Sequence, residues 1–559
     1  MITLKISFAI FLFYKNNISY QGTDITFEEV IILNKLLEMD FSRVGCSNEI
    51  YEVALGTKDI SLEEFIAVVR YGSRVVLTRE YLERVTKSRS LVEKFLAENR
   101  AIYGLTTGFG DNVRRVIPQN EAELLQRNII RSHSVSVGEP LSEEGVRALW
   151  LMQLLSLGRG YSGIRPEVLQ LIADCLNKGI FPVAPAEGCI QNLPVEGYVN
   201  LVLMGEGQAW YGGRLMSGAD ALTAAGLRPI SPACKEGLCL TNGINGATGV
   251  ALIALNDSIV AAQTADIVGA MAYEVLRGTL LACDPRLHSV KAHAEQAGAA
   301  ANVRMLLHDS EIAKNSLHLR VQDPYVIRCL PHVHGAAKRF IKDVARSLLR
   351  EMLSCNDNPV VWPEDGGEGL MGSNFDGTYT GAGADILCMA CANLAKISER
   401  RTDKLTNQSL SGGYPAFLAQ TPGVDNGYMI PQYTAAGLVG EIRGLCIPAT
   451  GDSIPVSANW EDPISMAWWA AMKAVDVTRK LHYIQAIELM VMARAFDLTP
   501  AEAGKFSSIT MLVHDKIRAK VPYVNGDRYF SPDIEEIYSL VSDGNIVREV
   551  QSVTGPLVF

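Results

Sequence analysis

The sequence lacks the features typical of nucleic-acid-binding and disulfide-rich proteins. Its 559 residues carry 51 Lys and Arg against 61 Asp and Glu, and a net charge of −10 offers no basic face to a nucleic acid. The 11 cysteines are odd in number and irregularly spaced, which argues against a disulfide framework. We therefore expect a globular protein that acts on a small molecule and binds no nucleic acid.

A long apolar segment is also missing from the N-terminus. The run from Ile6 to Tyr14 is nine residues long, which is too short to span a bilayer. It resembles the core of a signal peptide, but no Ala-x-Ala-like cleavage site follows it. We therefore expect a cytoplasmic protein with a nonstandard leader and no membrane partner.

Two short motifs resemble metal or redox sites but lack the residues to complete them. Cys388 and Cys391 in "CMAC" lie in an Ala-rich apolar stretch without a second cysteine pair, which predicts two buried core cysteines. His332 and His334 are close in sequence, but no third ligand is evident. We expect no metal.

Strand signals, internal repeats and flexible linkers are scarce, whereas long helical patterns are frequent. Ile464–Thr499 runs 36 residues between two prolines without Gly or Pro, far beyond an ordinary globular helix. Other long candidates are 247–277, 335–354 and 382–405, and 57–99 also has helical spacing. The predicted fold is all-α, a long central helix bundle with a loop-borne active site. The expected parts are an N-terminal extension at 1–56, an N-terminal region with active-site loops at 57–240, and the bundle core with C-terminal helices at 241–559.

Two loops in the N-terminal half carry candidate functional residues. In "AIYGLTTGFGDNV" (101–113), three glycines permit close backbone approach, and the phenol of Tyr103 is a candidate base. A tyrosine before a glycine more often only packs. In "LQRNIIRSHSVSVGEPL" (125–141), His133 lies among small polar residues beside a turn, which suits recognition of a ring. A hydrogen-bonded histidine at a helix end gives the same pattern.

Two further loops offer groups for a polar substrate. Gln322, Tyr325 and Arg328 in "LRVQDPYVIRCLPHVHG" recur every three residues, so a helical turn would align them on one face. That set suits a substrate carboxylate because arginine pairs with it bidentately, although an ordinary surface turn looks alike. In "SANWEDPISM", Glu461 and Asp462 precede the longest helix. Capping of that helix accounts for one acid but not necessarily both.

Taken in order, the motifs of the chain resemble those of the histidine and aromatic amino acid ammonia-lyase family. They are "YGLTTGFG", "RSHSVSVG", "LTNGINGATG", "RVQDPYVIRC", "NDNP", "GSNFDG", "ISERR" and "SANWED", spread between about Ile60 and Thr499. The resemblance implies a mostly helical homotetramer in which several subunits build each active site.

The resemblance also implies a role for each matching residue. Tyr103 matches the loop tyrosine that removes the β-proton, and Arg328 matches the arginine that binds the carboxylate. Asn242 in "LTNG" matches the substrate-binding asparagine, while His133 and Glu461 match the residues associated with imidazole recognition in histidine-type members. Other matching positions, expected to line the site, are Gln322, Tyr325 and Phe375.

One segment departs from the family because three residues are missing from it. Family members read approximately Gly-Ser-Val-Gly-Ala-Ser-Gly-Asp-Leu ahead of the "GEG" turn. The internal Ala-Ser-Gly cyclises to methylidene-imidazolone (MIO), the electrophile that captures the substrate amine. Here Gly188-Cys189-Ile190-Gln191 directly precedes Asn192-Leu193, and no Ala-Ser-Gly occurs elsewhere in the chain. We therefore expect no MIO and no other cofactor.

A site without MIO still suits one kind of substrate. MIO activates an amine through its lone pair, but a quaternary ammonium has none and departs as a neutral tertiary amine. The resemblance is therefore to the MIO-less branch of the family typified by ergothionase. The expected reaction releases trimethylamine from an imidazole betaine, foremost ergothioneine to thiolurocanate, with hercynine as the other candidate. Glu196 and Tyr198, which replaces a family histidine, are expected to face the leaving group with Phe375.

Three alternatives remain open on the sequence alone. One is a conventional histidine ammonia-lyase whose MIO segment aligns differently. Another is a lyase for a different aromatic betaine, and the third is a non-catalytic scaffold. Against the scaffold, the matching residues from Tyr103 to Glu461 are chemically competent.

Overall fold

The computed structural model describes Phe41 and residues 47–191 and 193–559. The apolar leader at Ile6–Tyr14 lies outside the described residues, as does the prediction of localisation that rests on it. The residues from Phe41 to Phe559 form one compact unit.

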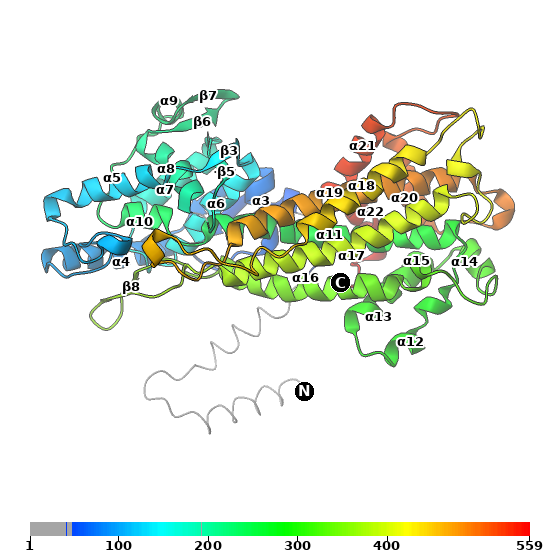
Figure 1. Ribbon diagram of the computed structural model, residues 1–559, viewed down its shortest axis with the longest axis horizontal. Coiled ribbons are helices and arrows are strands. Elements are labelled where there is room, and N and C mark those ends of the chain that lie inside the picture. The colour runs from blue at the N-terminus through cyan, green and yellow to red at the C-terminus, as the bar shows by residue number, and fades with distance from the viewer. Residues whose placement is uncertain (1–40, 42–46, 192) are drawn as a thin grey trace, which may run out of the picture. The chain divides into compact units, whose positions relative to one another are not determined.

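Long helices that run side by side form the core of this unit (Figure 1). The four longest are α11 (Asn245–Val275), α16 (Leu330–Met352), α17 (Thr378–Thr406) and α19 (Ala467–Leu498). Each matches a predicted long helix to within a few residues at either end, and α19 ends just before Pro500, as the proline rule requires. The all-α fold class is confirmed.

Helix α11 is the centre of the bundle. Nearly all of its side chains are buried, because α6 (Glu143–Leu157), α16, α17 and α19 surround it. Among the described residues, the stretch Glu236–Val275 is long and apolar enough to cross a membrane. However, 94% of its most apolar window is buried inside the protein, as expected of a core helix.

Shorter helices surround both ends of the bundle. On the N-terminal side they are α3 (Leu62–Tyr71), α4 (Arg79–Ala97), α5 (Ala122–His133), α7 (Pro166–Lys178), α8 (Leu193–Leu201), α9 (Gly218–Ala224) and α10 (Glu236–Thr241). On the other side they are α12 (Pro285–Ser289), α13 (Ala294–Leu306), α14 (Glu311–Asn315), α15 (Tyr325–Arg328), α18 (Met429–Leu445), α20 (Ser508–Lys520), α21 (Ser531–Ser542) and α22 (Asn545–Thr554). The boundary predicted between residues 240 and 241 falls in the last turn of α10, inside the compact unit.

The described strands are short and lie at the margins. Strand β1 (Glu52–Leu55) pairs in parallel with β2 (Arg74–Leu77), while β3 (Val137–Pro140) pairs with β5 (Pro185–Glu187). The remaining strands are antiparallel: β4 (Phe181–Pro182), β6 (Gln208–Tyr211) and β7 (Arg214–Ser217) in one sheet, β8 (Val360–Trp362) and β9 (Glu368–Leu370) in another.

The first two strands correct two expectations. The helix predicted over 57–99 is two helices, because Gly72 ends α3 in the left-handed conformation and the "RVVL" of β2 then favours a strand. Strand β1 lies within the predicted extension 1–56, yet it pairs with β2. The folded body therefore begins ahead of residue 57.

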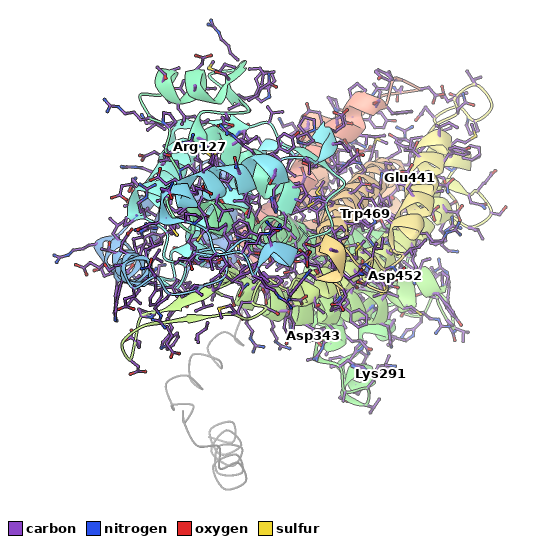
Figure 2. The ribbon with its side chains drawn as sticks, turned by 60° about the vertical axis from the view of Figure 1, so that its left-hand side comes forward. Arg127, Lys291, Asp343, Glu441, Asp452 and Trp469 are labelled. Atoms are coloured by element: carbon purple, nitrogen blue, oxygen red, sulfur yellow. The ribbon has the colours of Figure 1, made fainter. Side chains whose placement is uncertain are left out.

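Of the residues in the motifs that resembled metal or redox sites, His334, Cys388 and Cys391 are part of the packed core, whereas His332 is exposed. Cys388 and Cys391 are buried in α17, as predicted, and burial raises the pKa of Cys391 to about 12. The His334 Nδ1 lies 2.8 Å from Asp266, whose other oxygen accepts from Lys338 at 2.5 Å. Charged side chains such as Lys291 and Glu441 point outward, as Figure 2 shows.

Candidate active site

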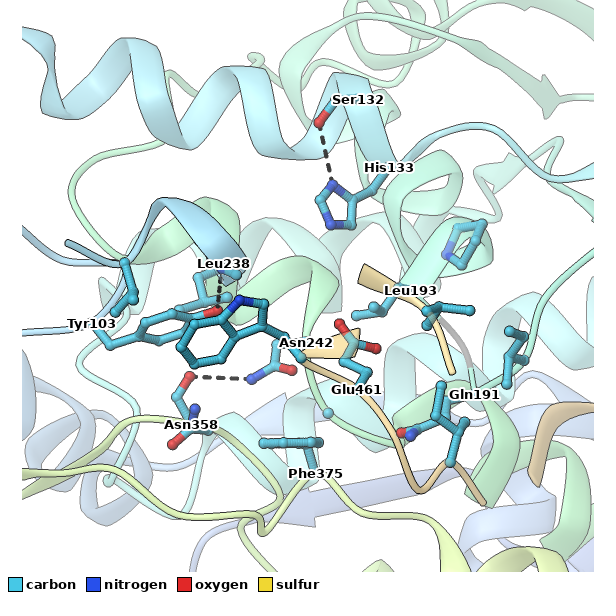
Figure 3. Close-up of a pocket in the computed structure, with 18 of the residues that line it drawn as sticks. Tyr103, Ser132, His133, Gln191, Leu193, Leu238, Asn242, Asn358, Phe375 and Glu461 are labelled. Carbon is cyan, nitrogen blue, oxygen red and sulfur yellow. Dashed lines mark hydrogen bonds between the residues drawn. The ribbon is translucent and has the colours of Figure 1, made fainter. Parts of the chain in front are cut away.

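A cavity of about 720 Å³ lies where several loops converge near the ends of α5, α8 and α10 (Figure 3). Five of the residues predicted from the sequence line it together: Tyr103, His133, Asn242, Phe375 and Glu461. They come from five separate stretches of the chain, and only the fold brings them together. Of the described residues that line the cavity, none is Lys or Arg.

The loop that carries Tyr103 is held against α10. Gln126 donates from its Nε2 to the Gly104 carbonyl at 3.0 Å and accepts from the Leu238 N–H at 3.1 Å. Gly104 has a φ of +64°, and a Cβ there would lie 2.5 Å from Leu238, so glycine is required. The Tyr103 oxygen accepts a hydrogen bond from the Gly110 N–H at 3.1 Å. The phenol oxygen therefore keeps a lone pair available at the cavity.

His133 is the last residue of α5 and has a defined tautomer. Its Nδ1 lies 2.8 Å from the Ile129 carbonyl oxygen, which can only accept, so Nδ1 carries the hydrogen. Burial lowers the pKa of His133 from its ordinary value, which favours the neutral ring. Nε2 is therefore a hydrogen-bond acceptor, suited to a ring N–H.

Asn242 is fixed at the end of α10. Its Nδ2 donates to the Asn358 carbonyl at 3.1 Å, which leaves its side-chain oxygen for a ligand. Beneath it, Lys235 and Asp357 form a fully buried ion pair at 2.6 Å that joins α10 to the segment carrying Asn358. Removing one partner of such a pair leaves an uncompensated buried charge, so this pair fixes the spacing of the two segments.

Glu461 and its neighbour Trp460 project from a strained turn. Ser457, Ala458 and Asn459 all have positive φ, between 53° and 64°, a conformation that costs roughly 1–2 kcal/mol per non-glycine residue. The Val456 N–H donates to the Glu461 carbonyl at 3.1 Å and closes the turn. The carboxylate of Glu461 makes no hydrogen bond or ion pair with any residue that the structure describes. It is therefore free to bind a substrate.

The residues between β5 and α8 do not fit the MIO group. Only residues 188–192 separate the two elements, without an Ala-Ser-Gly and with a single glycine. Trp468 holds this connection, since its Nε1 donates to the Ala186 carbonyl at 2.8 Å and its backbone N–H to the Ile190 carbonyl at 3.3 Å. Ile190 and Gln191 line the cavity there instead.

Glu196 and Tyr198 do not line the cavity, contrary to the prediction from the sequence. Helix α8 turns Leu193 and Pro194 toward the cavity, and the helical period then directs Glu196 into the core. There the carboxyl accepts from Gln153 Nε2 and from the Gly246 N–H, each at 3.0 Å. Burial raises the pKa of Glu196 to about 8. Glu196 therefore caps the first turn of α11 and does not face the leaving group.

Comparison with known proteins places this site in a family. The family model of aromatic amino acid lyases matches residues 60–519. The chain is 42% identical to the histidine ammonia-lyase of Symbiobacterium thermophilum over 501 residues, 89% of this chain and 98% of that protein. The chain belongs to the aromatic amino acid lyase family. It is a carbon–nitrogen lyase.

Solved structures of lyases share the fold. Histidine ammonia-lyase from Trypanosoma cruzi superposes with a TM-score of 0.84 at 33% identity, covering 90% of this chain and 95% of that one. Ergothionase from Treponema denticola superposes with a TM-score of 0.80 at 26% identity, covering 89% and 99%. The higher identities are to histidine ammonia-lyases, which agrees better with the conventional alternative than with the ergothionase-like reading.

The set of residues predicted to bind a carboxylate lies elsewhere in the same chain. Figure 1 shows α15 at the opposite end of the long helices from α5, α8 and α10. There the Arg328 guanidinium lies 4.5 Å from the centroid of the Tyr325 ring, and its Nε donates to the Asp323 carbonyl. With the Gln322 amide turned so that its oxygen faces Arg328, it accepts two further bonds. The three predicted residues thus cluster, although only the last two are in a helix.

Trp460 is a lining residue that the sequence interpretation missed. The signal was available, since an aromatic side chain next to the predicted substrate acid sits in an otherwise polar loop. Trp460 is 54% exposed, and its Nε1 donates to Asp111 at 3.0 Å, which joins the loops of Tyr103 and Glu461.

Proposed function

We propose that this lyase releases trimethylamine from an imidazole-bearing amino-acid betaine, ergothioneine or hercynine, without an MIO group. The observation that carries the proposal is the short connection at 188–192, which has no tripeptide to cyclise within a cavity that keeps the other family residues. A primary amine needs covalent activation to leave, whereas trimethylammonium leaves unaided as a neutral amine. The absence of the MIO tripeptide therefore fits a substrate whose leaving group needs no covalent activation.

Tyr103, as its phenolate, takes the β-proton of the substrate in this reaction. The electrons of that C–H bond form the Cα–Cβ double bond, and the C–N bond pair departs with trimethylamine. The products are a ring-conjugated acrylate, trimethylamine and a neutral tyrosine, so charge and atoms balance. A positioned base of this kind contributes typically ~10²–10⁴-fold to a rate.

His133 and Glu461 recognise the imidazole-type ring. The Nε2 of neutral His133 accepts from a ring N–H, and the carboxylate of Glu461 accepts from the second N–H that a thione ring or a protonated imidazole carries. Both contacts hold the ring whose π-system delocalises the charge that develops on the β-carbon. Asn242 offers its free amide oxygen beside them.

A second subunit supplies the carboxylate site in this proposal. The cavity has no lining Lys or Arg among the described residues, yet the substrate carries a carboxylate. Tyr325 is 70% exposed, and it lies with the partly buried Arg328 on α15 at the far end of the bundle. A closed homotetramer brings α15 of one subunit to the cavity of another.

A second candidate function is conventional histidine ammonia-lyase activity. The 42% identity to a protein of that name over nearly its whole length favours it. It requires an activating electrophile, for which the residues at 188–192 provide no precursor tripeptide.

One experiment separates the two functions. The full-length protein is incubated with ergothioneine, hercynine, histidine and tyrosine, and the acrylate is followed by ultraviolet absorbance while trimethylamine and ammonia are quantified. We expect trimethylamine from a betaine and no product from histidine, with Tyr103→Phe as the inactive control. Urocanate and ammonia from histidine, with no trimethylamine from either betaine, would establish the second candidate instead.

A further inference from the structure

The wall of the cavity is aromatic and negative. Tyr103, Phe375 and Trp460 contribute aromatic rings, and Glu461 contributes the charge. His133 adds no positive charge when neutral, and burial lowers its pKa. With no Lys or Arg among the described lining residues, the cavity of one subunit favours a cation.

Trp460 presents a fixed aromatic face at this cavity. It is 54% exposed, so much of its indole is available to a ligand. The hydrogen bond from its Nε1 to the Asp111 carboxylate at 3.0 Å fixes the ring. A carboxylate that accepts from the indole N–H also increases the electron density of the ring. Both effects strengthen the attraction of a π face for a cation, for which Trp is the best side chain.

The strained turn explains how Trp460 comes to lie there. Three consecutive left-handed residues, 457–459, reverse the chain so tightly that the two residues after them both reach the cavity. Backbone strain of this kind persists where the surrounding structure over-determines it, commonly at ligand sites. Trp460 and Glu461 are therefore placed as a pair, a π face beside a carboxylate.

We propose that the indole face of Trp460 forms the subsite for the quaternary ammonium group of the substrate, next to the ring site at Glu461. The assignment rests on the proposed function for the identity of that group, and it replaces Tyr198 and Glu196, which lie away from the cavity. The subsite takes a soft, weakly hydrated cation with methyl groups. A primary ammonium, which needs hydrogen-bond acceptors, fits it less well.

A matched pair of probes tests the subsite without any turnover. Choline and 3,3-dimethylbutan-1-ol have the same shape, but choline has a positively charged nitrogen where the alcohol has a neutral carbon. Calorimetric titration of the full-length protein should show that choline binds more tightly. Trp460→Leu removes the π face and should reduce that preference roughly 3- to 30-fold, whereas Trp460→Phe should retain part of it. Trp210→Leu is the matched control, since Trp210 is 48% exposed and does not line the cavity.

The outcomes distinguish the subsite from the reaction. Equal binding of the two probes to the wild-type protein, or an undiminished choline preference in a folded Trp460→Leu variant, would overturn the subsite. If a betaine releases trimethylamine while the choline preference of the Trp460→Leu variant is undiminished, the proposed function is supported and the subsite is overturned. A Trp460-dependent choline preference without betaine turnover would support the cation subsite and overturn the proposed function.

Discussion

The proposed sharing of active sites between subunits predicts that two inactive variants restore each other. Tyr103 lines the cavity at one end of the bundle, and Arg328 lies at the other end. Tyr103→Phe removes the base and should lower turnover ~10²–10⁴-fold. Arg328→Ala removes hydrogen bonds to a charged group, each contributing about 1.5–3 kcal/mol, so binding of the carboxylate should collapse as well. Each variant alone should be nearly inactive.

Co-expression of the two variants should recover a defined fraction of activity. Suppose that a site takes Tyr103 from one subunit and Arg328 from another. At equal expression of the two variants, each of these two residues is intact with a probability of one half. About a quarter of the sites in mixed assemblies are then wild type. If both residues came from one subunit, every site would carry a lesion and nothing would be recovered. At unequal expression, the active fraction of sites equals the fraction of subunits with an intact Tyr103 multiplied by the fraction with an intact Arg328.

The assay measures trimethylamine release by mixed assemblies purified through two different affinity tags. A matched control co-expresses the wild type with the double variant Tyr103→Phe/Arg328→Ala. Sites shared between subunits again give about a quarter of full activity in this control, whereas self-contained sites give about a half. A half in the control and none in the mixture would refute the shared site, and with it the role given to α15.

Three further predictions follow from the same structure. Peptides covering 183–200 should have the mass of the unmodified chain, and a deficit of two waters would reveal an MIO group. Burial raises the pKa of Glu196 to about 8, so the folded state holds this proton to higher pH than the unfolded chain does. Stability should therefore be full below about pH 4.5 and fall by up to about 1.4 kcal/mol per pH unit toward pH 8. Glu196→Gln should flatten that fall in thermal unfolding scans, and parallel curves for the two proteins would contradict the assignment. Burial lowers the pKa of His133, so kcat/KM should hold to below the ordinary histidine value of about 6.5, and His133→Gln should remove the decline at lower pH. A decline centred above that ordinary value, and abolished by this variant, would contradict the assignment.

The long helices were predictable because their signal is local and redundant. Over Ile464–Thr499, the absence of Gly and Pro and the flanking prolines all indicate one state, and α19 follows them closely. The break between α3 and α4 was not predicted, because "RVVL" fits either a helix or a strand. Its pairing with β1, about twenty residues earlier in the chain, decides the outcome.

The lining of the site was predictable only where a motif carried it. Tyr103, His133 and Glu461 lie at the cavity as expected. Glu196 does not line the cavity. Its side chain points toward α6 and α11 because of the way α8 is rotated about its own axis, and no local sequence pattern indicates that rotation. The bond between Trp460 and Asp111 joins residues 349 positions apart and emerges only from the folded chain.

The division of charge in this chain matches the two ends of the proposed betaine substrate. The cavity of one subunit has a carboxylate, aromatic rings and no lining Lys or Arg among its described residues, which suits the ammonium end. The guanidinium of Arg328 suits the carboxylate end, and it lies on α15, far from that cavity within one subunit. In the proposed homotetramer, α15 of one subunit would join the cavity of another, and the zwitterionic substrate would then lie between Glu461 and Arg328. A neutral amine would leave Glu461 without a positive partner, and a simple cation would leave the Arg328 guanidinium without a carboxylate, so such an assembly would favour zwitterionic substrates.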